Sequence, residues 1–320
     1  MGLGEFNLIE RYFEHQAVRR DDVATPIGDD AAVVSLADGC ELVVSVDTLI
    51  EGVHFPPQMP PQAIGHKALA VNLSDLAAMG AKPAWATLAL TLPHSDEAWL
   101  EAFCRGFFQL ADQYQVQLIG GDTCRGPLSL SVQIMGQVTS GEALTRCGAA
   151  AGDLIYVSGQ IGDAGLGLRL VQRQLQGVRD EDYFIQRLNC PAPRIEAGLA
   201  LRGVASAAID ISDGLVADLG HILKKSTVGA VLDVEALPVA EQVKSLAGEP
   251  WWQWPLSAGD DYELCFTVPP ARQPQAEALM AQMGCEISCI GVVEPRRGLR
   301  LRLADGQLIE ATRQGYRHFV

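Results

Sequence analysis

The sequence lacks a long apolar run, a basic cluster and closely spaced cysteine pairs. No apolar stretch approaches the ~20 residues that span a bilayer, and the first residues carry acids instead of a signal-peptide core. The net charge of −15 disfavours a nucleic-acid partner. The eight cysteines form no Cys-x-x-Cys pair, so they are interpreted as reduced core thiols. We expect a cytoplasmic protein without membrane or nucleic-acid partners.

The common nucleotide-binding motifs are also missing. The sequence contains no Gly-x-x-x-x-Gly-Lys-Ser/Thr loop, no Gly-x-Gly-x-x-Gly opening a βαβ unit, and no His-Arg-Asp or Asp-Phe-Gly set. The glycine-rich stretch SGQIGDAGLGL matches no strong phosphate-binding motif, and a flexible turn explains it better. Any nucleotide site in this chain therefore follows another scheme.

The composition is that of a globular protein of two domains. Of its residues, 48% are hydrophobic and 20% charged, which is typical of a folded protein. Its length of 320 residues is more than one ordinary core accommodates. A stretch of small residues over 139–153 predicts the joint between domains 1–140 and 141–320.

Both halves predict a mixed α+β fold, because short apolar strands alternate with helical patterns. In the first half, residues 31–36, 41–48, 83–93, 116–123 and 128–138 are expected to be strands, and 60–81 and 95–114 helices, the second capped by Ser95. In the second half, we expect strands over 154–159, 205–212 and 229–234, helices from about 163, over 194–203, 213–226 and near 276–284, a loop at NCPAP, a further segment at 257–268, and terminal strands.

Carboxylates recur where apolar strands are expected to end. Asp47, Asp122 and the pair Asp210 and Asp213 occupy such positions. Further acids occur in GDDAAVV and in the helical NLSDLAAMG, and a second Gly-Asp-Asp follows at Gly259, Asp260 and Asp261. Each acid taken alone has an ordinary explanation as a helix cap or turn residue. Strand ends are rigid platforms, so the recurrence carries more information than any single aspartate.

Acids gathered at one place would need cations. Two carboxylates about 4 Å apart repel by about 4 kcal/mol at an effective dielectric of 20. Hard oxygen ligands with few histidines or cysteines nearby favour magnesium over zinc or copper. Magnesium held by carboxylates shares its remaining positions with water and substrate phosphates. The pattern therefore predicts a magnesium site for a phosphorylated ligand, provided that the fold brings the acids together.

A known family carries the same ordered motifs. PIGDDAAVV, VSVDTLIEGVHF, NLSDLAAMGAKP, LIGGDTCRG, AIDISDGL and GDDYELCF together resemble the thiamine-monophosphate kinase family, which shares a superfamily with aminoimidazole ribonucleotide synthetase and selenophosphate synthetase. The resemblance extends from Gly4 to Phe319. It implies two α+β domains, a homodimer in which the N-terminal sheets form a barrel, and direct ATP-dependent phosphorylation of thiamine monophosphate to thiamine diphosphate.

The resemblance also implies roles for individual residues. Several Mg²⁺ ions would be held by Asp30, Ser45, Val46 (through its backbone oxygen), Asp47, Asp75, Asp122, Asp210 and Asp213. ATP would contact Gly121, Asp122, Arg146 and Ser212, and the thiamine phosphate would meet His54, Glu263 and Phe319. The residues expected to carry the transfer are Asp47, Asp122 and Arg146.

These residue types suit the implied reaction. Alignment and cations supply most of the catalysis of phosphoryl transfer, and an arginine can bind a phosphate with two donors. Because the acceptor is an ionised phosphate, no general base is required. Glu263 and Phe319 suit the thiazolium cation, although Phe319 could equally plug the core and His54 could be a satisfied loop histidine. Asp29 could serve merely to support Asp30.

One position departs from the family's motif, and two other functions stay open. Asp260 stands where the resemblance leads us to expect Glu, which puts a direct role for that position in doubt. Two alternatives remain: another ATP-dependent synthetase of the superfamily, and a non-catalytic Mg-nucleotide-binding protein. A selenophosphate synthetase is disfavoured, because the first cysteine is Cys40, in an expected turn.

Overall fold

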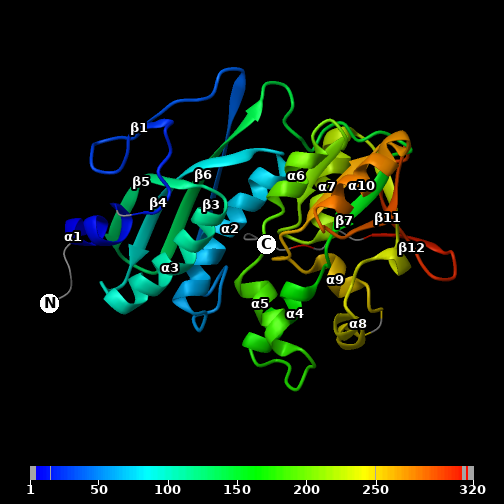
Figure 1. Ribbon diagram of the computed structural model, residues 1–320. Helices are drawn as coiled ribbons and strands as arrows, with labels where there is room; N and C mark the ends of the chain where they lie inside the picture. Colours follow the sequence, from blue (N-terminus) through cyan, green and yellow to red (C-terminus); the bar gives the residue numbers. More distant parts are fainter. Residues whose placement is uncertain (1–4, 15, 249, 312–314, 316–320) are drawn as a thin grey trace. The chain divides into compact units, whose positions relative to one another are not determined.

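The computed structural model describes residues 5–14, 16–248, 250–311 and 315 (Figure 1). The chain divides into two compact units. The first runs to Leu76 and resumes over Ala81–Gly141, and the second takes Ala77–Gly80 and the chain from Glu142 onward. No helix among these described residues is both long and apolar enough to cross a bilayer.

The first unit is built on a four-stranded sheet in the order β3-β6-β4-β5, in which β4 and β5 are parallel and the other pairs antiparallel. A short ribbon of β1 and β2 accompanies it. The elements are α1 (Glu5–Ile9), the π-helical η1 (Glu10–Glu14), β1 (Val23–Thr25), β2 (Val33–Val34), β3 (Cys40–Ile50), α2 (Pro61–Ala78), β4 (Lys82–Leu92), α3 (Glu97–Gln113), β5 (Gln117–Arg125) and β6 (Ser129–Thr139).

This sheet has one covered face and one open face. In β6, Leu130, Val132 and Ile134 are buried, whereas the intervening Gln133 is exposed, which is the alternation of a half-buried strand. Figure 1 shows α2 and α3 (blue and teal) running alongside these strands. The two helices approach closely at Gly65 and Gly106: a Cβ on Gly65 would lie 2.1 Å from the carbonyl oxygen of Phe103.

The open face carries an apolar row on the edge strand β3. Leu42, Val44, Val46 and Ile50 are exposed large hydrophobic residues at alternate positions, and Val46 is 60% exposed. Their register partners in β6 include Met135 and Gln133. We call these four residues the β3 open-face row. The strand order is linear, so within the described residues no sheet closes into a barrel.

The second unit is built on a seven-stranded sheet in the order β13-β12-β9-β11-β7-β10-β8, in which β12 and β9 are parallel. Its elements are β7 (Leu154–Ser158), α4 (Asp163–Val171), α5 (Glu181–Asn189), α6 (Ile195–Leu201), β8 (Ala207–Asp210), α7 (Leu215–Ser226), β9 (Gly229–Asp233), η2 (Val234–Ala236), α8 (Glu241–Ala247), α9 (Gln253–Ser257), β10 (Leu264–Val268), η3 (Pro270–Arg272), α10 (Gln273–Gln282), β11 (Ile287–Glu294), β12 (Gly298–Arg302) and β13 (Leu308–Glu310). Its core joins sheet residues such as Ile155 and Ile209 to Leu219 and Ile222 of α7.

Several sequence expectations were wrong. The cap of α3 is Asp96 and not Ser95, because the Asp96 carboxylate accepts from the amides of Ala98 and Trp99. Asp47 and Asp122 do not end their strands, since β3 continues to Ile50 and β5 to Arg125. The cysteines are not all core thiols, because Cys124, Cys147 and Cys289 are exposed. The helices α5, α8 and α9 were not expected.

Candidate active site

Ser45 and Asp75 are two predicted metal ligands that lie in direct contact in the structure. Ser45 lies on the covered face of β3, because its register partner in β6 is the buried Ile134. There the Ser45 hydroxyl donates a hydrogen bond of 2.5 Å to Oδ2 of Asp75, on α2. Asp47 is two residues along the same strand, so it emerges on the same face. These three residues form an oxygen-rich group between β3 and α2.

Asn72 fixes α2 against β3, and sequence reasoning missed it. Its side-chain oxygen accepts from the backbone amide of Asp47 at 3.1 Å, and its Nδ2 donates to the carbonyl of Ala68 at 3.0 Å. The residue is fully buried. A detectable signal was its spacing, because Asn72 precedes Asp75 by three residues and so shares its helix face.

Asp122 lies on another strand of the same sheet. Across the sheet, Asp122 of β5 is aligned with Thr48 of β3, through Ala89 of β4 and Ser131 of β6. Thr48 is the residue that follows Asp47 in β3. Because successive residues alternate between faces, the carboxylates of Asp47 and Asp122 leave the sheet on opposite sides. Three strand spacings, about 14 Å, separate their strands. Within this sheet the structure therefore does not bring these two predicted ligands to the same face.

Gly121 permits the close pairing of β5 with β4. A Cβ at this position would lie 1.9 Å from the carbonyl oxygen of Leu88, its register partner. Any larger residue would therefore push Asp122 and its neighbours away from β4.

Asp30 and His54 occupy loops of the first unit. Asp30 is exposed, and its amide donates to the carboxylate of Asp29 at 2.9 Å, which fits a supporting role for Asp29. His54 is half-buried, and its Nδ1 accepts from the amide of Ile50 at 3.0 Å. In the neutral imidazole this hydrogen bond places the proton on Nε2.

In the second unit, four predicted residues gather around the edge strand β8. Asp210 is the last residue of β8 and is buried, and Ser212 and Asp213 follow it. The carbonyl of Thr145 accepts from the amide of Ala208 at 3.0 Å, which places the neighbouring Arg146 beside the same strand. Here an acid does end its strand, as the sequence predicted.

The turn after β8 is held by a buried acid that sequence reasoning missed. Oδ2 of Asp218, in α7, accepts from the amides of Ser212 at 3.1 Å and Asp213 at 3.0 Å. Burial, followed by the negative charge of Asp213, raises the pKa of Asp218 to about 7. An acid inside an otherwise apolar helical stretch was the available signal.

The second Gly-Asp-Asp motif packs against this turn. The amide of Asp260 donates to the carbonyl of Ser212 at 2.9 Å, and that of Tyr262 to the carbonyl of Ile211 at 2.8 Å. Asp260 and Tyr262 both have positive φ, of 69° and 50°, although neither is glycine. Such left-handed residues cost of order 1–3 kcal/mol each and concentrate at functional sites.

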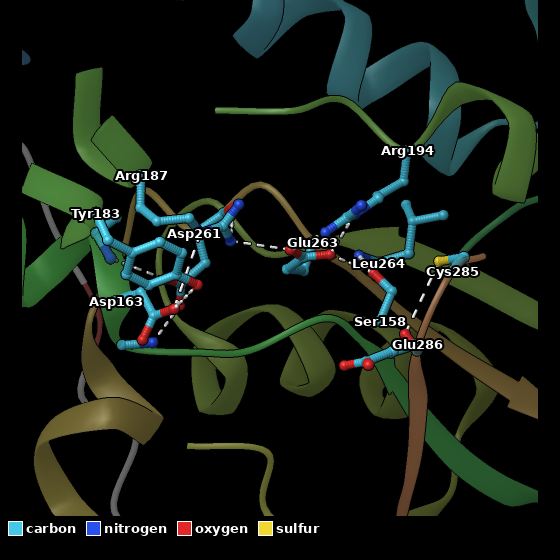
Figure 2. A network of polar contacts seen from close by, with 12 residues as sticks. Ser158, Asp163, Tyr183, Arg187, Arg194, Asp261, Glu263, Leu264, Cys285 and Glu286 are labelled. Carbon is cyan, nitrogen blue, oxygen red and sulfur yellow. Dashed lines mark hydrogen bonds and ion pairs between the residues drawn. The ribbon is translucent and has the colours of Figure 1, made fainter. Parts of the chain in front are cut away.

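Glu263 lies at the centre of a buried polar network (Figure 2). Arg194 donates to both carboxylate oxygens at 2.6 Å, and Nη2 of Arg187 donates at 2.9 Å. The hydroxyl of Ser158 donates to Oε2 at 2.6 Å. Figure 2 shows the two arginines flanking Glu263 from opposite sides. The carboxylate has no exposed surface, so it acts on its surroundings through these arginines.

A second part of the network joins α4 to α5. Asp163 is fully buried and accepts from the hydroxyl of Tyr183 at 2.7 Å, while Asp261 accepts from the amide of Gly162 at 2.8 Å. Burial raises the pKa of Asp163, and raises that of Asp261 well above its ordinary value. Asp261 is therefore a buried acid at the start of α4.

Phe319 lies outside the described residues. Within the part of the chain that the structure describes, no three His, Cys, Asp or Glu side chains are grouped so as to hold a metal ion. Among the described residues of each unit, the predicted acids therefore form small groups and no preformed cage of three or more such ligands.

Two family models match this chain, one in each of its two units. Residues 28–138 match the family described as AIR synthase related protein, N-terminal domain, and residues 150–304 match the C-terminal domain of the same family. The thiamine-monophosphate kinase of Salmonella typhimurium is 49% identical over 324 residues, covering 100% of this chain and 99% of that protein.

Solved structures show the same relationship. The crystal structure of thiamine-monophosphate kinase from Stenotrophomonas maltophilia has a TM-score of 0.87 at 47% identity, covering 96% of this chain and 98% of that one. The structure of AaThiL complexed with AMPPCP and TMP has a TM-score of 0.78 at 32% identity, covering 98% and 96%. The chain therefore belongs to the thiamine-monophosphate kinase family and has the two-domain fold of the AIR synthase related proteins.

Proposed function

We propose that this protein transfers the terminal phosphoryl group of ATP to thiamine monophosphate, giving thiamine diphosphate. The observation that carries the proposal is the 49% identity, over the whole chain, to a protein named thiamine-monophosphate kinase. The relative solved with AMPPCP and TMP supports the same pair of substrates.

Mg²⁺ fits the donor chemistry of the predicted residues. Ser45, Asp47 and Asp75 offer hydroxyl and carboxylate oxygens on one face of β3, without a histidine or cysteine among them. In our proposal the ions are held by these residues and by Asp30, the backbone oxygen of Val46, Asp122, Asp210 and Asp213. Bound there, Mg²⁺ would neutralise phosphate charge, and the small groups of acids leave coordination positions for water and phosphate.

The nucleotide is assigned to Gly121, Asp122, Arg146 and Ser212. Arg146 is exposed beside β8, so its planar guanidinium is available for two parallel hydrogen bonds to a phosphate. The fold supports this assignment by placing Arg146 and Ser212 around one strand.

The acceptor is assigned to His54, Glu263 and Phe319. With Nδ1 held by the amide of Ile50, His54 presents an Nε2 proton that suits a phosphate oxygen. Glu263 is enclosed and paired with Arg187 and Arg194, so in our proposal it acts on the acceptor by fixing these two arginines.

The chain's own residues serve to bind and align two anions. The acceptor is a phosphate that is ionised at neutral pH, so no residue needs to remove a proton from it. Phosphoryl transfer passes through a loose transition state with negative charge on the equatorial oxygens. Most of the rate acceleration therefore comes from aligning the reactants and stabilising that charge. The transfer is direct, and no side chain is phosphorylated on the way.

We further propose a homodimer in which the N-terminal sheets of two copies meet in a barrel. The β3 open-face row supports this, because four exposed apolar side chains on one edge strand are costly in a monomer. Sedimentation velocity tests the proposal: Val44→Asp should convert a dimer to a monomer, whereas Leu308→Asp, at an exposed apolar position of the second unit, should leave it a dimer. A wild-type monomer at micromolar concentration would refute it.

Purified protein with Mg²⁺, ATP and thiamine monophosphate tests the activity. We expect stoichiometric thiamine diphosphate and ADP, separated by chromatography. Consumption of formylglycinamidine ribonucleotide in place of thiamine monophosphate would favour a synthetase of the same superfamily. ATP that is bound but never consumed after the acceptor is added would favour a binding protein.

A further inference from the structure

The helix α7 begins without a side-chain cap of the usual kind. Its N-cap position is Gly214, which has no side chain to offer. Asp218, one turn into the helix, reaches back, and its Oδ2 accepts from the amides of Ser212 and Asp213. A carboxylate returning from inside a helix to amides ahead of it resembles the second half of a capping box.

The turn that precedes α7 is held from the other side as well. The carbonyl of Ser212 accepts from the amide of Asp260 at 2.9 Å. Gly259 permits this approach, because a Cβ there would lie 2.5 Å from that carbonyl oxygen. The peptide groups of Ser212 and Asp213 are therefore fixed by the Asp218 carboxylate and by a backbone segment that carries two left-handed residues.

We infer that Asp218 is a positioning residue of the phosphoryl-transfer site, holding the backbone of Ser212 and Asp213 so that their side chains meet nucleotide and Mg²⁺. The inference rests on the proposed function, which assigns those two residues to ligands. Asp218 is 3% exposed, so it is enclosed by protein and acts through the turn.

If Asp218 only stabilised the helix α7, its loss would have different effects. Stabilising α7 requires an acceptor for orphan amides, and it has no consequence for ligand affinity. Holding a ligand-binding turn requires that loss of the acceptor lower ligand affinity even where the fold persists. The two roles therefore separate in a measurement that reports on the turn and the ligand together.

The experiment compares Asp218→Ala with Asp218→Asn. The Asn side-chain oxygen can still accept from both amides, whereas Ala cannot. We expect Asp218→Ala to weaken binding of the ATP analogue AMPPCP with Mg²⁺ by about ten- to a hundredfold in calorimetric titrations. Asp218→Asn should stay within about threefold of wild type, within the range of a retained hydrogen bond. The KM for ATP should follow the same order.

A second readout reports on the turn without any ligand. Hydrogen exchange of the peptide containing residues 211–214 should accelerate in Asp218→Ala and stay slow in Asp218→Asn. The matched control is Asp96→Ala, because Asp96 also accepts two helix-terminal amides, at α3, where no site residue is predicted. Asp96→Ala should lower stability and leave analogue affinity unchanged.

The outcomes separate this inference from the proposed function. Analogue affinity in folded Asp218→Ala equal to that of wild type would overturn the inference, as would a loss of affinity in Asp218→Asn equal to that in Asp218→Ala. If Asp218→Ala fails to fold, fast exchange or weak binding in Asp218→Asn overturns it, and wild-type values support it. The wild-type assay with thiamine monophosphate tests the proposed function independently.

Discussion

Arg194 donates two hydrogen bonds of 2.6 Å to the carboxylate of Glu263, one to each oxygen. Arg187 and Ser158 add further donors, so the buried carboxylate has four hydrogen bonds from three side chains. One acid thereby fixes two guanidinium groups. In the proposed site, Glu263 would therefore act on the acceptor through those arginines, because its carboxylate is enclosed.

Replacing Glu263 with Gln should destabilise the second unit. Two largely buried guanidinium groups would lose their common counter-charge, and breaking a buried ion pair on one side costs about 3–5 kcal/mol. Urea unfolding measures this loss. The control is Glu310→Gln, which removes an exposed ion pair with Arg296 and should cost less than about 1 kcal/mol. Equal losses in the two variants would show that the Glu263 network contributes no more than a surface pair.

Replacing Asp47 or Asp122 with Asn should abolish phosphoryl transfer and leave the fold intact. Each change removes a charge proposed to hold a cation, and we expect kcat to fall at least about a hundredfold. Steady-state assays and circular dichroism provide the two measurements. Asp38→Asn, in an exposed turn of the same unit, is the control and should keep wild-type rates. Wild-type rates in both Asp47→Asn and Asp122→Asn would remove the metal assignment.

Gly121 and Gly120 offer a matched pair of substitutions. A Cβ on Gly121 would lie 1.9 Å from the carbonyl oxygen of Leu88, whereas the nearest atom to a Cβ on Gly120 is a methyl group of Thr87 at 4.0 Å. We therefore expect Gly121→Ala to lower the free energy of unfolding by more than about 2 kcal/mol and to impair turnover. Gly120→Ala should change it by less than about 1 kcal/mol. Similar losses of unfolding free energy in the two variants, measured by thermal unfolding, would mean that β5 shifts freely against β4.

Local sequence patterns predicted much of the framework. The strand expected over 128–138, observed as β6, and the acid that ends β8 follow from residues close together in the chain. The lengths of β3 and β5 did not follow, because a strand continues for as long as its neighbour offers partners. Ile50 of β3 still pairs with Ser129 of β6, three residues beyond Asp47.

The parts of the site that sequence reasoning missed depend on distant contacts. Arg187 and Arg194 meet Glu263 from positions 76 and 69 residues away, a pairing that no local pattern encodes. The helix α5 carried a usable signal, since its first turn is acidic, Arg187 lies in its last turn, and Phe184 and Leu188 share one face. The adjoining NCPAP segment instead suggested a loop.

Asp261 should make stability depend on pH in an unusual direction. Burial raises its pKa in the folded protein well above the ordinary value of 3.8, so folding favours the protonated acid. Its contribution to stability is fully present below about pH 3.8 and is lost as the pH rises through the raised folded pKa. Asn cannot ionise and keeps an acceptor for the amide of Gly162. The free energy of unfolding of wild type, measured in urea from pH 5 to 8 without ligands, should therefore fall relative to that of Asp261→Asn as the pH rises. A constant difference between the two proteins across this range would mean that Asp261 is ionised in the fold throughout, held by the amide of Gly162 and the charge of Arg187.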